Sequence, residues 1–533
     1  MKQKLLAVGV SLLLVAAFAV GCTPGEIVSN TDTETESATV AETTVESETE
    51  TETETAADTE ADTQPVTESD TESETEAETE PLEKGYAVLF KEELPREGFE
   101  IGADNSIGLR FTVAEKYALD TITTDCITWG DRVGSMQLCF YRWDTDYATT
   151  VAAEPAYIHT VENFISPQWD LSLTGSTQDH AFVTVDLPAG TVGEGEWLFL
   201  YQNGSGNVGI NRVGANRRPF PGDDGGVINV SECYVNGDTS NRHPTTNVTY
   251  APVETPAETP ADPDGYTKLS AGKAHVILLG GQSNAAGASY VPKLANTVAR
   301  EDLERYNRGY DNVYIYTALP DFTNNGFVKC RLGVLSKNSA TFGPELGLAD
   351  YLARTYPNET FYIVKSAIGG TNLSVDWNVG GSAYTLFDNH VTNALEALEA
   401  QGLEPEIFAM LWMQGESDAD VMSQRTKDYV TRFDDLIKRI ETKYADYMAE
   451  GGMAIVDSAI CEQTVWQYAA IINQMKEQYA ATSQNYYFLD SNAAGIDTWD
   501  EMGDPMHYDS DDMIELGELF GQCVGQILTN AGY

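Results

Sequence analysis

A serine and a histidine, each in a loop expected to follow a strand, are the residues best suited to do chemistry. Ser283 lies in residues 280–287, which read GGQSNAAG, and glycines beside it permit a tight turn. His507 lies near the C-terminus, three residues after Asp504. Serine is a weak nucleophile until a base takes its proton, and histidine is the usual base, oriented by a carboxylate. The three residues therefore predict nucleophilic catalysis by serine.

The choice of His507 rests on its place in the expected fold. The other histidines after residue 270 are His275 and His390. His275 precedes an apolar run, which is the wrong end of a strand, and His390 falls in a helical pattern. Taken alone, the turn at Ser283 could equally bind an anion or simply reverse the chain; its pairing with Asp504 and His507 favours catalysis.

The elements that must position these residues alternate along residues 270–533. Strand-like apolar runs occupy 275–280, 361–367, 406–413, 453–460 and 486–490, with helical patterns near 343–355, 385–401, 421–449, 464–482 and 511–529. Such alternation predicts an α/β fold with three layers, in which helices cover both faces of a parallel sheet. Ligands bind such sheets at the carboxyl ends of the strands, where Ser283 is expected.

Five stretches carry a resemblance to a known family. They are GQSNAAG at 281–287, FGPELGLA at 342–349, KSAIGGTNL at 365–373, LWMQGESDA at 411–419 and DPMHYDS at 504–510. In this order they resemble the SGNH hydrolase superfamily, and within it the branch of sialate O-acetylesterase-like proteins and family 6 carbohydrate esterases (acetyl xylan esterases). The resemblance covers nearly all of residues 270–533 and implies a flavodoxin-like α/β/α domain.

The resemblance also implies roles. Ser283 matches the nucleophile, and Asp504 and His507 match the acid and the base. The N–H groups of Ser283 and of Gly369 would stabilise the oxyanion, with Gly370 as the alternative to Gly369.

The third block departs from the general superfamily, because Ser417 stands where an asparagine is usual. The amide of Gln414 would replace that donor at the oxyanion. Glu416 could orient His507 or a substrate hydroxyl, or replace Asp504 as the acid, and the sequence leaves this open. The secondary candidates are Gln282, Asn284, Gly370 and Trp377; Trp377 could stack on a sugar or simply pack.

The N-terminal residues predict export. Lys2 and Lys4 precede an apolar run from Leu5 to Val20, which is typical of a signal peptide. The run ends at Cys22 in a sequence that resembles a bacterial lipobox, so residues 1–22 are expected to be a lipoprotein signal with lipidation at Cys22. Residues 23–84, rich in Thr and Glu, predict a disordered tether. The protein is therefore expected to be exported and lipid-anchored at the bacterial cell surface.

Residues 85–250 predict an all-β sandwich, because short β-branched runs alternate with turn residues and no convincing amphipathic helix interrupts them. A segment rich in proline and acid, 251–269, links it to the catalytic domain. Several aromatic residues could bind sugar or form the core of this domain: Trp129, Trp143, Trp169, Trp197, Tyr141 and Tyr201.

Net charge and composition limit the classes of molecule that the protein is expected to bind. The chain carries a net charge of −52; residues 23–83 hold 21 acids and no base, and residues 84–533 hold −33. Such acidity argues against nucleic acid, whose phosphates need basic patches, and favours neutral polysaccharides over polyanions. The seven cysteines show no metal-binding spacing, so we expect no metal, and catalysis by serine requires no organic cofactor. No protein partner can be deduced.

These features predict a serine carboxylic-ester hydrolase that removes acetyl groups from polysaccharide or oligosaccharide. Acetylated xylan or a similar hemicellulose is the favoured substrate, and O-acetylated sialic acid is the alternative. A hypothesis from another class is a glycan-binding surface lipoprotein with an inactive hydrolase domain. A lipase or thioesterase is disfavoured, since no long apolar insertion is present to form a substrate groove.

Overall fold

The structure is a computed structural model, and it describes fourteen stretches of the chain. These are residues 82–90, 96–128, 134–162, 179–206, 208–213, 226–253, 265–317, 326–334, 340–420, 422–462, 465–496, 498, 504 and 506–532. The expected signal peptide, Cys22, the tether and most of the linker at 251–269 lie outside them. Among the helices of these stretches, none is long and apolar enough to cross a membrane.

The C-terminal part contains a seven-stranded sheet with strand order β16-β15-β18-β13-β19-β20-β21. Its central strand β13 pairs in parallel with β18 and β19, and only β16, at the edge, runs antiparallel to its neighbour. The strands are β13 (Ala274–Gly281), β15 (Val313–Thr317), β16 (Gly326–Lys329), β18 (Phe361–Ala367), β19 (Pro405–Met413), β20 (Ala454–Ser458) and β21 (Tyr486–Leu489); a separate ribbon joins β14 (Ser289–Tyr290) to β17 (Thr341–Phe342).

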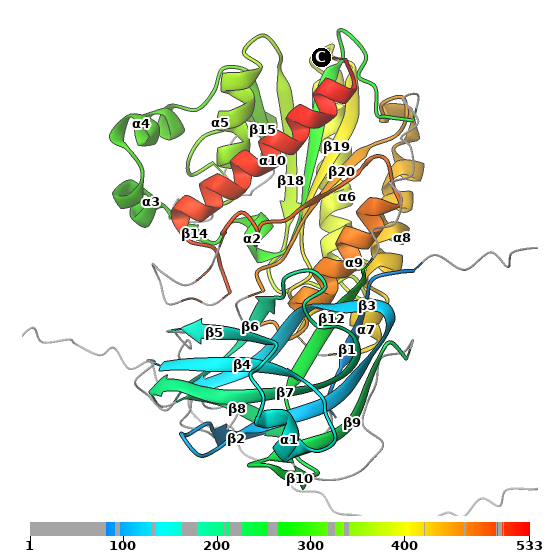
Figure 1. Ribbon diagram of the computed structural model, residues 1–533. Coiled ribbons are helices and arrows are strands. Elements are labelled where there is room, and N and C mark those ends of the chain that lie inside the picture. Colours follow the sequence, from blue (N-terminus) through cyan, green and yellow to red (C-terminus); the bar gives the residue numbers. More distant parts are fainter. Residues whose placement is uncertain are drawn as a thin grey trace, which may run out of the picture. The chain divides into compact units, whose positions relative to one another are not determined.

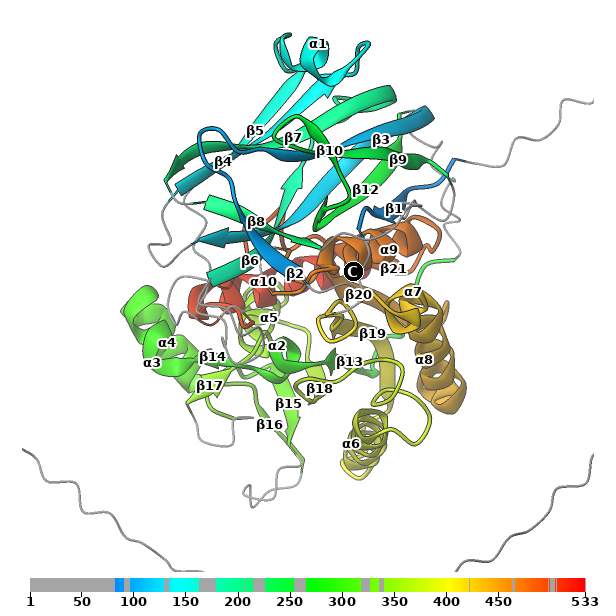
Figure 2. The same cartoon turned by 90° about the horizontal axis from the view of Figure 1, so that it is seen from below.

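Helices cover both faces of this sheet. Figures 1 and 2 show α5 and α10 on one face and α6 on the other. The helices are α2 (Ser283–Ala286), α3 (Val291–Thr297), α4 (Arg300–Arg308), α5 (Glu345–Thr355), α6 (Ser382–Glu399), α7 (Gln424–Lys427), α8 (Tyr429–Lys443), the 3-10 turn η1 (Ala445–Tyr447), α9 (Ala469–Ala481) and α10 (Ser510–Asn530). Every residue of β13 and β19 is buried, as expected for strands covered on two sides.

The predicted strands and helices of this part are observed with small shifts at their ends. The helix predicted over 421–449 is instead two helices, because the backbone leaves the helical region at Asp428, where φ is −89° and ψ is 7°. The structure also contains elements that were not predicted, namely α2, α3, α4, β14, β15, β16 and β17. The sequence of β15, VYIYT, is only five residues long, which is too short for its alternation to stand out.

The N-terminal part is built from strands around the long strand β3 (Ile107–Thr128). The first half of β3 pairs with β7 and β9, and its second half pairs with β12, β6 and β8. The switch follows Lys116, whose φ of 70° bends the strand. β3 thus links the strands of this part into one 12-stranded sheet among the described residues, and the sandwich stays a prediction.

The remaining elements of this part follow, with one short helix that was not predicted. They are β1 (Gly85–Val88), β2 (Arg96–Glu100), β4 (Gly134–Arg142), α1 (Tyr147–Val151), β5 (Tyr157–Glu162), β6 (Asp179–Asp186), β7 (Gly193–Gly206), β8 (Val208–Val213), β9 (Ile228–Val235), β10 (Asp238–Ser240), β11 (His243–Pro244) and β12 (Thr246–Pro252).

Most of the described aromatic residues proposed as sugar ligands are core residues. Trp197, Tyr201 and Tyr141 are buried. Trp143 is partly buried, and its ring lies under the Arg110 guanidinium at 4.0 Å. Trp129 and Trp169 lie outside the described residues. For Trp197, Tyr201 and Tyr141, burial favours the packing interpretation over sugar binding.

Candidate active site

The nucleophile candidate sits at the carboxyl end of the central strand. Ser283 follows β13 and opens the short helix α2. Gly281 makes this turn possible, because its φ is 140° and a Cβ there would lie 1.9 Å from the Met413 carbonyl oxygen. No side chain fits in that space, so glycine is required for β13 to lie this close to β19 before the chain turns.

Of the two glycines considered for the oxyanion, Gly369 is the one beside the serine. A Cβ on Gly369 would lie 3.3 Å from the Cβ of Ser283, whereas a Cβ on Gly370 would meet nothing within 4 Å. Gly370 instead has a φ of 71°, which lets the loop turn after β18. The structure therefore brings Gly369 and Ser283 together and gives Gly370 a role in the turn.

His507 and Asp504 lie together in the loop before α10. The Nδ1 atom of His507 is 2.8 Å from Oδ2 of Asp504, and the Met506 N–H donates to Oδ1 of Asp504 at 2.9 Å. Burial alone would raise the pKa of Asp504, but the hydrogen bonds from His507 and Met506 hold it below its usual value. Asp504 is thus kept as a carboxylate facing the ring nitrogen that must carry a proton.

Asn284 ties this histidine loop to the serine loop. Its side-chain oxygen accepts from the Tyr508 N–H at 3.3 Å, and its amide nitrogen donates to the Met506 carbonyl at 3.3 Å. These two contacts bracket His507. Asn284 is 2% exposed, so its amide bridges two segments more than 200 residues apart without help from solvent. From the sequence we expected Asn284 only as a secondary candidate. Its contacts in the structure give it this positioning role.

Glu416 joins the same network from the third block. Its Oε1 accepts from the Asn284 amide at 3.0 Å, while its Oε2 is buried without a hydrogen bond among the described residues. Burial raises the pKa of Glu416. Among the described residues, the carboxylate that contacts His507 is Asp504, so the structure pairs Asp504 with the histidine and places Glu416 behind Asn284.

The expectation that Gln414 donates to the oxyanion does not match the geometry. Gln414 is fully buried, and its amide nitrogen donates to the Thr371 carbonyl at 3.0 Å and to Oδ2 of Asp418 at 2.6 Å. Both amide hydrogens are therefore in use. Asp418 also accepts from the Leu373 N–H at 3.2 Å. Gln414 and Asp418 thus join the second and third blocks, and their role is to position these loops.

Trp377 is likewise corrected from a sugar platform to a core residue. It is 1% exposed, its indole N–H donates to Oγ1 of Thr371 at 3.1 Å, and its ring lies 4.7 Å from that of Trp412. A ring enclosed in this way has no face for a substrate. Trp377 follows the second block closely in sequence because its side chain packs against that loop and supports it.

Two supporting residues were missed in the sequence, Asp418 and Lys476. Lys476 is fully buried and donates to the Gln414 carbonyl at 2.8 Å, to Asp457 at 2.7 Å and to the Ser458 carbonyl at 2.7 Å. A lysine among the apolar residues of α9 was the available signal, since buried lysines are rare unless paired. Asp418 had a weaker signal, its spacing of four residues from Gln414.

The surroundings of the site are open on the histidine side. A shallow depression with a cavity volume of only about 10 Å³ borders Asp504 and His507, and its wall includes Tyr290, whose side chain is exposed. In the described part of the chain, no group of His, Cys, Asp and Glu side chains is arranged to hold a metal ion.

Comparisons with known proteins add to this geometry. Residues 273–526 match the model of a family described as carbohydrate esterase, sialic acid-specific acetylesterase. A search of curated proteins found no match to the chain.

Several solved structures are similar to parts of the chain. A protein from Arabidopsis thaliana is 19% identical, with 48% of this chain and 99% of that chain covered at a TM-score of 0.37. The protein NanS is 14% identical, with 49% and 99% covered at 0.37. A family two carbohydrate esterase from Clostridium thermocellum, in complex with cellohexaose, is 11% identical, with 84% and 100% covered at 0.26.

Residues 273–526 are thus similar to carbohydrate esterases of the sialic acid-specific acetylesterase family, which supports an ester hydrolase of the carbohydrate esterase class.

Proposed function

We propose that this chain is a carbohydrate O-acetylesterase that uses Ser283 as nucleophile and His507 as base, with Asp504 as the acid that orients the base. The observation that carries the proposal is the 2.8 Å contact between His507 and Asp504, in a loop that Asn284 ties to the serine loop. A nucleophile loop, a base and an orienting carboxylate at one edge of a parallel sheet suit acyl transfer.

The reaction would proceed in two halves. His507 takes the proton of Ser283 as its oxygen attacks the acetyl carbonyl, and the N–H groups of Ser283 and Gly369 stabilise the oxyanion. The sugar hydroxyl leaves with the proton from His507. Water then attacks the acetyl-enzyme with His507 again as base, and acetate leaves as Ser283 regains its proton.

The substrate class is supported by the family match, and the individual glycan is part of the proposal. The sequence favours acetylated xylan because an exported, tethered enzyme with an accessory β domain suits a polymer, and the acidity of the chain makes polyanions less attractive. The family description favours an acetylated sialic acid. Both sugars carry the acetyl ester that this site would cleave, so they are the two substrates to compare.

The test is acetate release by the whole purified chain from acetylated xylan, O-acetylated sialic acid and 4-nitrophenyl acetate. Ser283→Ala removes the nucleophile, and Ser374→Ala, a serine of the neighbouring loop that bonds to Asn372, is the matched control. We expect acetate from at least one glycan, lost in Ser283→Ala and kept in Ser374→Ala. Activity that survives Ser283→Ala would contradict Ser283 as the nucleophile. Glycan binding without cleavage of any ester would favour the glycan-binding lipoprotein instead.

Export and anchoring also belong to the proposal. The apolar run before Cys22 and the acidic segment after it support a lipoprotein held at the bacterial cell surface. Metabolic labelling with an alkyne fatty acid should mark the chain, and Cys22→Ala should abolish the label while Cys523→Ala keeps it. A label that persists in Cys22→Ala would contradict lipidation at this residue.

A further inference from the structure

The N-terminal part contacts α9 of the catalytic part through buried amide side chains. Residues Glu78–Tyr533 form one compact unit, to which both parts belong. The Asn247 side chain of β12 donates to the Gln467 carbonyl at 3.2 Å, and the Gln474 side chain of α9 donates to the Tyr250 carbonyl at 3.3 Å. All four residues are buried, so this contact has a hydrogen-bonded centre that solvent does not reach.

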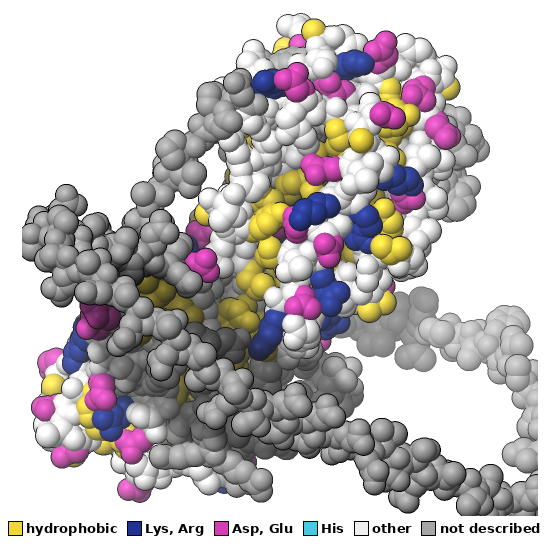
Figure 3. All heavy atoms as spheres, turned by 90° about the vertical axis from the view of Figure 1, so that its right-hand side faces the viewer, with side chains coloured by type: hydrophobic (Ala, Val, Ile, Leu, Met, Phe, Trp, Pro, Cys, Tyr) yellow, Lys and Arg dark blue, Asp and Glu magenta, His cyan; other side chains and the backbone are white. Residues whose placement is uncertain are grey.

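The edge of the same contact is charged. Lys84 pairs with Glu477 of α9, and both side chains are partly exposed. Figure 3 shows charged side chains of both signs mixed over the surface nearest α8, which lies beside α9. Exposed ion pairs contribute little to stability, because water and salt screen them. The buried amide hydrogen bonds therefore determine how the N-terminal part meets α9.

The peptide group between Gln467 and Tyr468 is hydrogen-bonded on both sides. Its carbonyl accepts from Asn247 of the N-terminal part, and its N–H donates to the Ala419 carbonyl at 2.9 Å. Ala419 is the last residue of the third block. Because a peptide unit is planar and rigid, it transmits the position of Asn247 directly to the third block.

Arg96 fixes the side chain of the same glutamine. Its guanidinium donates to Oε1 of Gln467 and, at 3.2 Å, to Oδ2 of Asp125, which is fully buried. The Gln467 amide nitrogen donates in turn to the Tyr468 hydroxyl at 2.8 Å. Gln467 is thus held at its backbone and at its side chain, and each of these contacts includes a residue of the N-terminal part.

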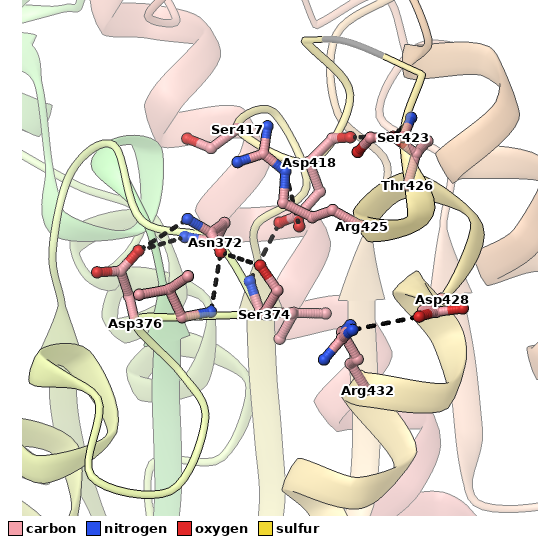
Figure 4. A network of polar contacts seen from close by, with 12 residues as sticks. Asn372, Ser374, Asp376, Ser417, Asp418, Ser423, Arg425, Thr426, Asp428 and Arg432 are labelled. Carbon is pink, nitrogen blue, oxygen red and sulfur yellow. Dashed lines mark hydrogen bonds and ion pairs between the residues drawn. The ribbon is translucent and has the colours of Figure 1, made fainter. Parts of the chain in front are cut away.

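The third block ends in a tight turn that several helices hold. The Ala419 N–H donates to the Gly415 carbonyl at 2.8 Å, which closes the turn, and Oγ1 of Thr426 donates to the Asp418 carbonyl at 2.8 Å. Figure 4 shows Ser417 and Asp418 on this turn, with Thr426 of α7 close to Asp418. The turn is therefore held by α7 on one side and by the peptide before α9 on another.

The same turn makes contacts within the candidate active site. Glu416 accepts from the Asn284 amide, whose other bonds bracket His507. The Ser417 N–H donates to Oε1 of Gln282, the residue before Ser283, at 3.3 Å. A displacement of the turn at Ala419 would therefore reach both the base and the nucleophile.

We propose that the N-terminal part braces the active site, with Asn247 and Arg96 as positioning residues that act on the third block through the Gln467–Tyr468 peptide. The inference rests on the proposed function, since the esterase site is what they position. The N-terminal part would then be needed for the hydrolysis of every acetyl ester, small or polymeric, whether or not it also binds sugar.

Two competing accounts of the contact lead to different results. If the N-terminal part only binds glycan, changes at Asn247 raise KM for polymers at most and leave a small ester unaffected. If the contact only adds stability, the variants unfold at lower temperature but keep the native kcat while they are folded. A brace predicts a lower kcat on a small ester with little change in KM, because misplacing reacting groups by about 1 Å can cost about 10²-fold.

The experiment measures kcat and KM of the whole chain on 4-nitrophenyl acetate, and hydrogen exchange of peptides that span residues 411–420. Asn247→Asp keeps the size of the side chain but replaces the amide donor by a carboxylate facing the Gln467 carbonyl. Gln474→Glu makes the same change at the second buried contact. Asn203→Asp is the matched control, because the Asn203 amide donates to the Ile101 carbonyl at 2.6 Å within the N-terminal part. Thermal unfolding checks that each variant is folded at the assay temperature.

We expect Asn247→Asp to lower kcat about 10- to 100-fold and to change KM less than about threefold. Gln474→Glu should lower kcat in the same way, and Asn203→Asp should change it less than about twofold, since its lost hydrogen bond lies away from α9. Amides of residues 411–420 should exchange faster in the two contact variants and at the native rate in the control, because loss of the brace makes local opening easier.

Native kcat in folded Asn247→Asp and Gln474→Glu would overturn the inference, and so would an effect of equal size in Asn203→Asp. A higher KM for polymers alone would favour a glycan-binding role for the N-terminal part. If the native protein cleaves no acetyl ester, the proposed function fails, and the exchange of residues 411–420 still shows whether the N-terminal part holds the third block. Unchanged exchange in both contact variants would contradict the brace in that case too.

Discussion

Replacing Asp504 with asparagine tests the arrangement of the candidate triad. Asparagine keeps the size of the side chain, but its amide can donate to Nδ1 of His507, where the carboxylate oxygen now lies at 2.8 Å. The proton of the neutral ring would then sit on Nε2, the atom that must accept the proton of Ser283. The base would be blocked while the loop keeps its shape.

The expected loss follows from this change of tautomer. A triad with the wrong tautomer loses about 10³- to 10⁴-fold in kcat, or about 4 to 5.5 kcal/mol of transition-state stabilisation. Glu416→Gln is the matched control, since it was the other candidate for the acid. Glu416 contacts Asn284 at 3.0 Å, so its change should cost less than about 50-fold, the worth of one hydrogen bond to a charged group.

The assay is kcat on 4-nitrophenyl acetate, with thermal unfolding as the check on folding. Asp504 does not orient the base if Asp504→Asn keeps more than about a tenth of the native kcat, which is a change below about 1.4 kcal/mol. Its assignment is also contradicted if Glu416→Gln loses as much as Asp504→Asn, because Glu416 would then share or hold the acid role.

Four further predictions test the surroundings of the site. Asn284→Ala should lower kcat about 10²-fold and lower the free energy of unfolding, because it removes the bridge to the histidine loop; unchanged kcat would contradict this. Gly369→Ala should lower kcat by crowding the nucleophile, whereas Gly370→Ala should mainly cost about 1 kcal/mol of stability at its positive φ; equal kcat values for the two would argue against Gly369. Trp377→Ala should cost about 3 to 5 kcal/mol of stability, and Trp377→Phe should leave KM for glycans unchanged, so a raised KM in a folded Phe variant would restore the sugar-binding role. Burial raises the pKa of Asp418 to about 6, so the folded protein holds a proton that the unfolded chain has released; relative to Asp418→Asn, the free energy of unfolding should therefore fall by about 2 kcal/mol as pH rises from about 4 to about 6, and a flat difference across that range would contradict the shift.

The sequence was enough to predict the central strands of the catalytic sheet because they are mostly apolar runs separated by helical patterns. The run at 275–280 corresponds to β13, and those at 361–367 and 406–413 correspond to β18 and β19. Short elements were missed because five residues such as those of β15 carry too little periodicity. The break at Asp428 depends on one backbone conformation, which the helical pattern on either side conceals.

The residues of the candidate site also fall into those that the sequence could predict and those that it could not. Residue type and strand position were enough to select Ser283, Asp504 and His507, because few side chains can serve as nucleophile and base. They were not enough to place Gln414 and Trp377, because polar and aromatic groups near a site can face it or support it. Only the contacts in the structure show whether such a group faces the site or supports it. Gln414 and Trp377 are both buried and hydrogen-bonded to neighbouring residues, so they support it.

The most direct test of the account is to map the residue that reacts with a fluorophosphonate, an acylation mimic for catalytic serines. We expect a single labelled peptide that carries the label on Ser283, with labelling slowed by an acetylated glycan and abolished in His507→Ala. Labelling of another serine, labelling that His507→Ala leaves unchanged, or no protection by any acetylated glycan would contradict a serine esterase acting on carbohydrate at this site.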